Sequence, residues 1–272
     1  MRFAEYFTEN NQFRFIDHVR SGEHPWSALV DIKKLITRET GSIEDSGISK
    51  LKDSIRLDKV TSLHGEVKET ALSVIKSIVL PHPIHISSAG ILIEEGVYLE
   101  YGAIIKAPCI IMKNTEIRQG AYLRGDVIIG EGCVVGHVSE VKNSIFMDHS
   151  HAGHFAYVGD SILGSHVNLG AGTKLANLQF RTRGEIETDA LGVIVIRSGD
   201  GLINTGLYKL GAVIGDYTEI GCNTVTSPGV CAQSDCWIYP NTTVPKGFYQ
   251  RKSIIRARGA GVVDVSSRPD IP

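Results

Sequence analysis

A six-residue repeat is the feature that most constrains what this chain can fold into. From Ile93 onward, every sixth residue is aliphatic or methionine through ten consecutive positions, the last of which is Met147. The residues four places after these positions are mostly small or β-branched, such as Ala103, Cys109 and Cys133. Neither the 3.6-residue period of a helix nor the two-residue period of a strand produces this pattern. A period of six predicts a parallel β-helix in which three hexads close one triangular coil.

The repeat also assigns roles to its own residues. The aliphatic residue of each hexad is expected to fill the interior, and the small residue is expected where the corner is tight. Cys109, Cys133 and Cys236 occupy small positions, so we interpret them as packing groups and not as ligands. The phase shifts after the tenth position, resumes at Leu163 and returns from Ile214 onward. The pattern resembles the hexapeptide-repeat superfamily, which implies a mainly β fold built as a left-handed parallel β-helix.

Three regions are expected along the chain. Residues 1–64 form a small N-terminal helical region, because "HPWSALVDIKKLITRE" has Pro25 in a first turn and apolar residues on one face. Such a region would cap the open edge of the β-helix. Residues 65–258 form the β-helix, with 65–81 as early, imperfect coils. A projecting β-hairpin is expected at 184–208, where two β-rich runs flank Ser-Gly-Asp-Gly, and 259–272 form a C-terminal tail.

Composition excludes several classes of partner. The formal net charge of −2 gives no general attraction to nucleic acid or to an anionic membrane. No apolar run approaches the roughly 20 residues of a membrane span, and the N-terminus lacks the pattern of a secretory signal. Five cysteines without a CxxC motif argue against a disulfide framework. We expect a cytoplasmic protein with no nucleic-acid or membrane partner.

Three cations recur at a spacing of eighteen residues, which is one coil. Lys106, Arg124 and Lys142 each follow an interior aliphatic residue and therefore point outward. Their backbones should stack about 5 Å apart, and like charges at that spacing repel. A bound phosphate would reverse the sign of this interaction. Alternatively, the cations pair with neighbouring carboxylates such as Glu100 and Glu140.

The stretch "HSHAGHFAYVGDS" at 149–161 places three histidines within six residues. Met147 and Leu163 are sixteen residues apart, which is not a multiple of six, so we expect the chain to leave the regular coil here. Irregular loops on rigid scaffolds often carry chemistry. A metal site, a proton acceptor and solvated loop histidines are all compatible with the cluster itself.

The surrounding sequence resembles a known family. The stretches "LRGD", "SEVKNSI" and "HAGHFAYVGDSILGSHVNLGAGTKLANLQF" are similar to the acetyltransferase domain of bifunctional N-acetylglucosamine-1-phosphate uridyltransferase/glucosamine-1-phosphate acetyltransferases. They are closer still to the related sugar-1-phosphate nucleotidyltransferase/acetyltransferases, and the match spans roughly residues 90–245. The resemblance implies an acetyl-CoA-dependent N-acetyltransferase acting on an amino-sugar 1-phosphate or related sugar nucleotide. It also implies a homotrimer with sites between subunits.

Residue roles follow from the resemblance, position by position. It implies that His154 is the general base, and that Tyr157 and Asn168 bind the sugar. Arg124 and Lys142 would hold its phosphate, and Asn177 would contact acetyl-CoA. An amine that attacks a thioester must lose a proton, and an imidazole can accept it near neutral pH. Arg183 stands where both relatives have lysine and would also contact substrate, and Arg256 would meet the phosphates of coenzyme A. Leu178 stands where the uridyltransferase type has tyrosine.

Two other functions are compatible with the fold. A γ-carbonic-anhydrase-like zinc site would use His149 and His154, but its third ligand would fall on Lys113, so that His151 or His137 would have to replace it. We therefore expect no metal. A β-helix that binds partners without catalysis is the second alternative. Nucleotidyltransferase activity is not expected, because the roughly 90 residues before Ile93 are too few for that domain and lack its glycine-rich loop.

Overall fold

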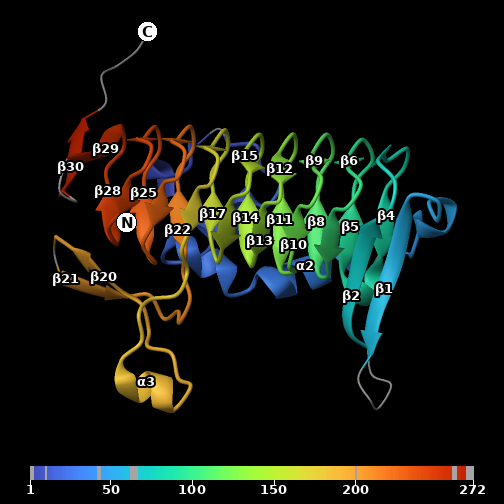
Figure 1. Ribbon diagram of the computed structural model, residues 1–272, viewed down its shortest axis with the longest axis horizontal. Coiled ribbons are helices and arrows are strands. Elements are labelled where there is room, and N and C mark those ends of the chain that lie inside the picture. Colours follow the sequence, from blue (N-terminus) through green and yellow to red (C-terminus); the bar gives the residue numbers. More distant parts are fainter. Residues whose placement is uncertain are drawn as a thin grey trace, which may run out of the picture.

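The computed structural model describes residues 3–9, 11–41, 44–61, 67–199, 201–258 and 262–267. Within these residues the dominant element is a parallel β-helix, in which each coil adds one short strand to each of three long sheets (Figure 1). The fold is therefore mainly β, and the prediction from the six-residue repeat is confirmed. We name the three faces of the β-helix after a central strand of each sheet.

The β10 face and the β11 face each contain nine strands among the described residues. In sheet order, the β10 face consists of β1 (Ile55–Thr61), β2 (Val67–Val74), β7 (Ile104–Lys106), β10 (Tyr122–Leu123), β13 (Glu140–Lys142), β16 (Tyr157–Gly159), β19 (Lys174–Leu175), β24 (Val225–Thr226) and β27 (Thr243–Val244). The β11 face consists of β28 (Gly247–Tyr249), β25 (Val230–Ala232), β22 (Ala212–Ile214), β17 (Ile162–Leu163), β14 (Ser144–Phe146), β11 (Val127–Ile129), β8 (Cys109–Ile111), β5 (Ile91–Ile93) and β4 (Ile84–Ile86).

The β12 face contains ten strands within the same described ranges. It consists of β3 (Ile78–Val79), β6 (Tyr98–Leu99), β9 (Glu116–Ile117), β12 (Val134–His137), β15 (His151–His154), β18 (Asn168–Leu169), β23 (Glu219–Ile220), β26 (Trp237–Ile238), β29 (Ser253–Arg258) and β30 (Val262–Ser267). Strand β30 runs antiparallel to β29 and lies in the predicted tail 259–272, whose other residues fall outside the described ranges.

The interior of the prism is filled as the repeat predicts. Ile105, Leu123 and Val141 are fully buried and belong to one continuous apolar cluster with the other interior aliphatic residues. The small positions are buried too, and Cys109 and Cys133 have no exposed area. Each coil therefore buries its own side chains against those of the coils above and below.

The prediction that the histidine stretch leaves the coil is wrong. Strand β15 pairs in parallel with β12 and β18, and β16 pairs in parallel with β13 and β19. This coil contains seventeen residues in place of the usual eighteen, because Val158 lies opposite Val141. The shorter coil accounts for the irregular spacing in the sequence. Asn143 and Asp160 adopt left-handed backbone angles (φ 44° and 48°), which let these two corners turn with one residue fewer.

The same shortening changes which residue faces the interior. Phe146, and not Met147, packs in the central cluster. Ile145 and Met147 instead join a second apolar cluster outside the prism. A corner that loses one residue shifts the following strand by one position, and in a strand this exchanges the inner and outer sides.

Most of the N-terminal helices lie along one side of the β-helix (Figure 1), whereas η3 (Ile48–Lys50) lies beside the first strands, where Ile48 and Leu51 pack against the interior cluster. The other helices of this region are η1 (Phe3–Glu5), α1 (Ile16–Arg20), η2 (Pro25–Leu29) and α2 (Ile32–Thr40), and a further short turn is η4 (Ser87–Ala89). Leu29, Ile32 and Ile36 pack against outward residues of the β11 face, including Ile110 and Ile128. This second core exists because that face carries aliphatic residues on its outer side as well.

Antiparallel strands occupy the N-terminal end of the β-helix. Residues 67–86 add one strand to each face, namely β2, β3 and β4, but these strands run antiparallel to their neighbours: β2 pairs with both β1 and β7, β3 with β6, and β4 with β5. The β1–β2 pair therefore covers the sheet edge that the helices were expected to protect.

An insertion of residues 178–209 separates β19 from β22. It begins and ends at one point, where the Leu210 backbone N–H donates to the Asn177 carbonyl (3.1 Å). It contains α3 (Arg183–Glu187) and an antiparallel pair, β20 (Val195–Ser198) and β21 (Gly201–Asn204). Asp200, in the predicted turn, lies outside the described residues. Ile194 and Ile196 are buried in the second core, whereas α3 stands away from the β-helix (Figure 1).

Among the described residues, no helix has both the length and the apolar character needed to cross a bilayer.

Candidate active site

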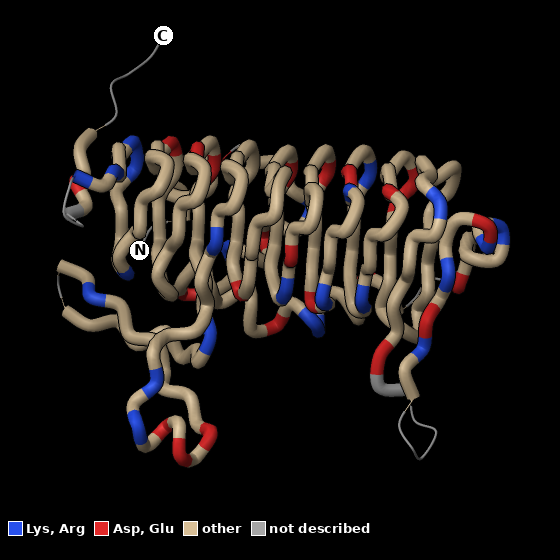
Figure 2. Tube along the Cα trace, viewed as in Figure 1, with Lys and Arg blue, Asp and Glu red and all other residues tan. Residues whose placement is uncertain are grey.

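The three cations form a column on the β10 face. The register places Tyr122 opposite both Ile104 and Glu140, so the residues that follow each interior position stack in successive coils. Each cation has a carboxylate partner: Lys106 pairs with Glu69, Arg124 Nη1 lies 2.7 Å from Glu140 Oε1, and Lys142 Nζ lies 3.7 Å from Asp160 Oδ2. These acids offset the repulsion expected from stacked cations. In Figure 2, basic and acidic positions are likewise interspersed along the coils.

The column ends at a glycine. Gly159 lies opposite Lys142 in the next coil. A methyl group at Gly159 would lie 2.5 Å from the Tyr157 hydroxyl and 2.8 Å from the Asn177 side-chain nitrogen. The missing side chain therefore leaves the space in which Tyr157 and Asn177 meet, directly beside the last cation.

Asp160 organises this cluster. Its carboxylate accepts hydrogen bonds from the side-chain amides of Asn143 (2.8 Å) and Asn177 (2.5 Å) and pairs with Lys142. Burial raises the pKa of Tyr157, and the charges of Asp160 and Glu140 add to this effect. Tyr157 is consequently a hydrogen-bond donor at neutral pH.

Sequence reasoning missed Asp160. No local signal marks it, because the dipeptide Gly-Asp at 159–160 also occurs at 125–126, 199–200 and 215–216. The copies at 125–126 and 159–160 lie at the corner between the β10 and β11 faces, where Asp126 and Asp160 have left-handed backbone angles.

His154 lies on the other side of a neighbouring corner. It ends β15, is exposed, and lines a hollow of about 360 Å³ together with His151, Asn168 and Arg118. The Asn168 amide also donates to Glu219 (2.9 Å). Only Phe155 and Ala156 separate His154 from Tyr157, so the hollow and Tyr157 flank the corner between the β12 and β10 faces, whereas Asp160 lies at the other end of β16.

The hollow continues along the β12 face. A second hollow of about 500 Å³ shares Asn168, Gly170 and Cys222 with the first and extends to Trp237 and Tyr239. The two together form a groove that runs from His154 toward the C-terminal coils.

Two residues predicted for the site lie apart from it. Arg183 projects from α3, where its side chain pairs with Glu187 (2.8 Å). Arg256 on β29 pairs with Asp264 on β30 (3.2 Å). Within one chain, neither lines the His154 hollow or contacts the Asp160 cluster. The structure thus brings together His154 with Asn168, and Tyr157 with Lys142 and Asn177, across one corner.

The neighbouring His149 takes part in a stack of aromatic rings. His149 stacks on His166 (5.0 Å between ring centroids), and His166 stacks on Tyr217 (4.8 Å). Across the residues that the structure describes, no three or more His, Cys, Asp or Glu side chains are grouped so as to hold a metal ion.

The fold is that of a parallel β-helix built on a six-residue repeat. Residues 105–195 match the family model of the GMPPB C-terminal domain. The chain is 38% identical over 110 residues to the bifunctional sugar-1-phosphate nucleotidylyltransferase/acetyltransferase of Sulfurisphaera tokodaii, an alignment that covers 40% of this chain and 25% of the relative. It is 37% identical over 105 residues to the bifunctional protein GlmU of Methanocaldococcus jannaschii, covering 38% of this chain and 23% of that protein.

These relatives confirm the predicted resemblance to bifunctional nucleotidyltransferase/acetyltransferases, although the matched part is only about a quarter of their length. Among solved structures, a UDP-N-acetylglucosamine acyltransferase of Francisella novicida shares 15% identity at a TM-score of 0.45. That alignment covers 63% of this chain and 58% of the other.

Proposed function

We propose that this chain is an acetyl-CoA-dependent N-acetyltransferase that acts on an amino-sugar 1-phosphate or a related sugar nucleotide. The observation that carries the proposal is the arrangement around residues 154–157. An exposed imidazole lines a groove on one side of the corner, and a polar cluster with a cation lies on the other. The name of the Sulfurisphaera tokodaii relative, a bifunctional sugar-1-phosphate nucleotidylyltransferase/acetyltransferase, supports the same chemistry.

In this reaction His154 acts as general base. The substrate amine attacks the thioester carbonyl of acetyl-CoA, His154 accepts the proton of the amine, the C–N bond forms and the C–S bond breaks. Coenzyme A leaves as a thiol after taking up a proton. Positioned general bases of this kind contribute about 10²–10⁴-fold to rates. Side-chain amides near the groove, such as that of Asn168, are suited to stabilise the negative charge on the carbonyl oxygen.

The other proposed contacts divide between the two sides of the corner. Arg124 and Lys142 hold the phosphate, and Tyr157 donates a hydrogen bond to the sugar. Asn177 contacts acetyl-CoA, whose extended arm fits the groove that leads past Trp237.

Arg183 and Arg256 are proposed to act at boundaries between subunits. Arg183 projects on α3, and the nearby Phe180 is fully exposed in the single chain. In the proposed homotrimer this insertion would reach the site of a neighbouring subunit, and Arg256 would contact coenzyme A phosphates at such a boundary.

The test is a free-thiol release assay with acetyl-CoA over a panel of amino-sugar 1-phosphates and nucleotide-linked amino sugars. His154→Ala should lower the rate below about one-hundredth of wild type. His149→Ala, which removes an exposed histidine outside the groove, should leave the rate close to wild type. Equal rates for wild type and His154→Ala would remove His154 from the mechanism. No thiol release with any substrate, and no change in melting temperature on adding acetyl-CoA, would favour a non-catalytic binding protein.

A further inference from the structure

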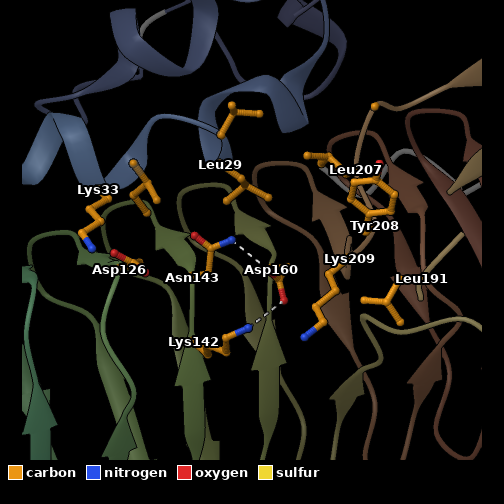
Figure 3. A pocket seen from close by; sticks show the side chains of 13 residues that line it. Leu29, Lys33, Asp126, Lys142, Asn143, Asp160, Leu191, Leu207, Tyr208 and Lys209 are labelled. Carbon is orange, nitrogen blue, oxygen red and sulfur yellow. Dashed lines mark hydrogen bonds and ion pairs between the residues drawn. The ribbon is translucent and has the colours of Figure 1, made fainter. Parts of the chain in front are cut away.

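A cavity of about 520 Å³ lies between three parts of the chain that are distant in sequence (Figure 3). One wall is the N-terminal region, with Leu29 and Lys33. The floor is the corner of the β-helix that carries Asp126, Lys142 and Asp160. The insertion closes the third side with Leu207, Tyr208 and Lys209. The hexapeptide repeat supplies only the floor, so the cavity depends on the two additions to it.

The charges in the cavity are not balanced within the protein. Three lysines line it, and Lys142 pairs with Asp160. Among the described residues, neither Lys33 nor Lys209 forms an ion pair. Ammonium groups that face a cavity without a protein carboxylate at contact distance are suited to a multiply charged anion.

One acceptor in the cavity also lacks a partner. The Oδ1 atom of Asp126 is buried and accepts no hydrogen bond. Burial raises the pKa of Asp126, while the nearby charges of Lys33 and Lys142 oppose this effect. A buried acceptor without a donor costs free energy of about 1–3 kcal/mol, and a ligand hydroxyl or ammonium group would recover it.

The upper wall is apolar. Leu29 and Leu207 face the cavity together with the ring of Tyr208 (Figure 3). A ligand that fits this arrangement has an anionic group at the lysines, a donor toward Asp126 and a less polar face against these side chains. Sugar phosphates combine these properties, since the faces of their rings carry C–H groups.

We propose that this cavity binds a phosphorylated, hydroxyl-bearing ligand of the sugar-phosphate class. Lys33 and Lys209 join Lys142 in holding the phosphate, and Asp126 accepts a hydrogen bond from a hydroxyl or ammonium group. The cavity shares Lys142 and Asp160 with the candidate active site. The identification of this ligand with the acetyl acceptor therefore rests on the proposed function, whereas the phosphate site itself does not.

The binding test uses isothermal titration calorimetry on the full chain with three probes: glucosamine 1-phosphate, glucosamine and inorganic phosphate. The double variant Lys33→Gln/Lys209→Gln should bind glucosamine 1-phosphate about tenfold or more weakly than wild type. Lys34→Gln is the matched control, because Lys34 follows Lys33 on α2 but pairs with Asp31 and does not line the cavity. Its affinity should equal that of wild type. Both lysines of the double variant are exposed, so folding should be preserved, and circular dichroism checks this.

A second variant tests the donor contact. Asp126→Asn keeps the side-chain shape, and asparagine tolerates the left-handed backbone angle of this position (φ 53°). It should weaken binding of glucosamine 1-phosphate but not of inorganic phosphate, which separates a sugar phosphate from a free phosphate as the ligand. Equal effects on both probes would overturn the assignment of Asp126.

Two outcomes would overturn the phosphate site: equal affinity of wild type and the double variant for glucosamine 1-phosphate, or equal affinity of wild type for glucosamine and its phosphate. The thiol-release assay separates this inference from the proposed function. If the chain is an active acetyltransferase and its KM for the sugar phosphate is unchanged in the double variant, the ligand of the cavity is not the acetyl acceptor, and the proposed function stands. If the chain shows no acetyl transfer, but wild type binds the sugar phosphate and the double variant does not, the phosphate site is supported and the proposed acetyltransferase function is refuted.

Discussion

The covered β11 face and the open β10 face are built from the same hexads, yet they differ on their outer sides. Outward residues of the β11 face are aliphatic and have no exposed area: Ile110, Ile128, Ile145, Ile162 and Val213. Outward residues of the β10 face are half-buried or exposed and are mostly polar or aromatic: Ile104, Tyr122, Glu140, Tyr157 and Lys174. The N-terminal helices and strand β20 cover the first face and leave the second open.

This difference shows how one repeat can serve two purposes. The inward residue of a hexad maintains the coil on every face, while the outward residue decides whether the face becomes a second core or carries chemistry. An aliphatic outer surface is stabilised by burial under the helices. A polar outer surface remains available to a ligand, and the Asp160 cluster lies on that surface.

The largest difference between the two faces is expected when an outward isoleucine of each face is replaced by alanine and the loss of stability is compared. Ile128→Ala on the β11 face should lower the free energy of unfolding by about 2–5 kcal/mol, because it opens a cavity in the second core. Ile104→Ala on the β10 face, where the side chain is 39% exposed, should cost about 1 kcal/mol or less. Urea denaturation measures both. Similar losses for the two variants would mean that the β10 face is also covered, for instance by another subunit.

A smaller effect, on activity and not on folding, is expected at the end of the cation column. Gly159→Ala introduces a methyl group 2.5 Å from the Tyr157 hydroxyl, so Tyr157 and Asn177 must shift. Displacement of binding groups by about 1 Å can cost about 10²-fold in rate. Gly199→Ala is the control, since a methyl group there meets no atom within 4 Å. Thiol release by Gly159→Ala at the wild-type rate would show that this cluster does not position substrate.

The smallest effect concerns the corner where the β11 and β12 faces meet. His166 is stacked between His149 and Tyr217, and its partial burial, followed by the charge of His149, lowers the pKa of His166. The unfolded chain therefore binds a proton at His166 more readily than the folded chain. Stability from this residue is present above the ordinary histidine pKa of about 6.5 and is lost as the pH falls through the lowered value.

His166→Gln removes this pH-dependent contribution to the stability of the fold. Its melting temperature should fall less than that of wild type between pH 7.5 and pH 5.5, as measured by circular dichroism. His137→Gln, which changes an exposed histidine on the β12 face, serves as the control. A steeper fall for His166→Gln than for wild type would contradict the sign of this effect.

Much of the site could be predicted because a β-helix converts sequence spacing into spatial spacing. Arg124 and Lys142 stack as their eighteen-residue separation predicts, and Asn168 lies one coil after His151 in register. Asp160 was missed because its role depends on partners in the coils before and after it, Lys142 and Asn143 in one and Asn177 in the other, which no local pattern displays. Arg183 could not be placed, since the insertion that carries it has no repeat to fix its position.

The sequence by itself determined the parallel β-helix, its interior and the column of cations, because all three follow from a period that each coil repeats. Only the tertiary structure decided that the histidine stretch stays within the coil, since left-handed corners at Asn143 and Asp160 let a coil close with one residue fewer. Only the tertiary structure brought Lys33 and Lys209 to the same cavity. Their meeting depends on how the helices and the insertion pack around the β-helix, and packing between distant segments leaves no period in the sequence.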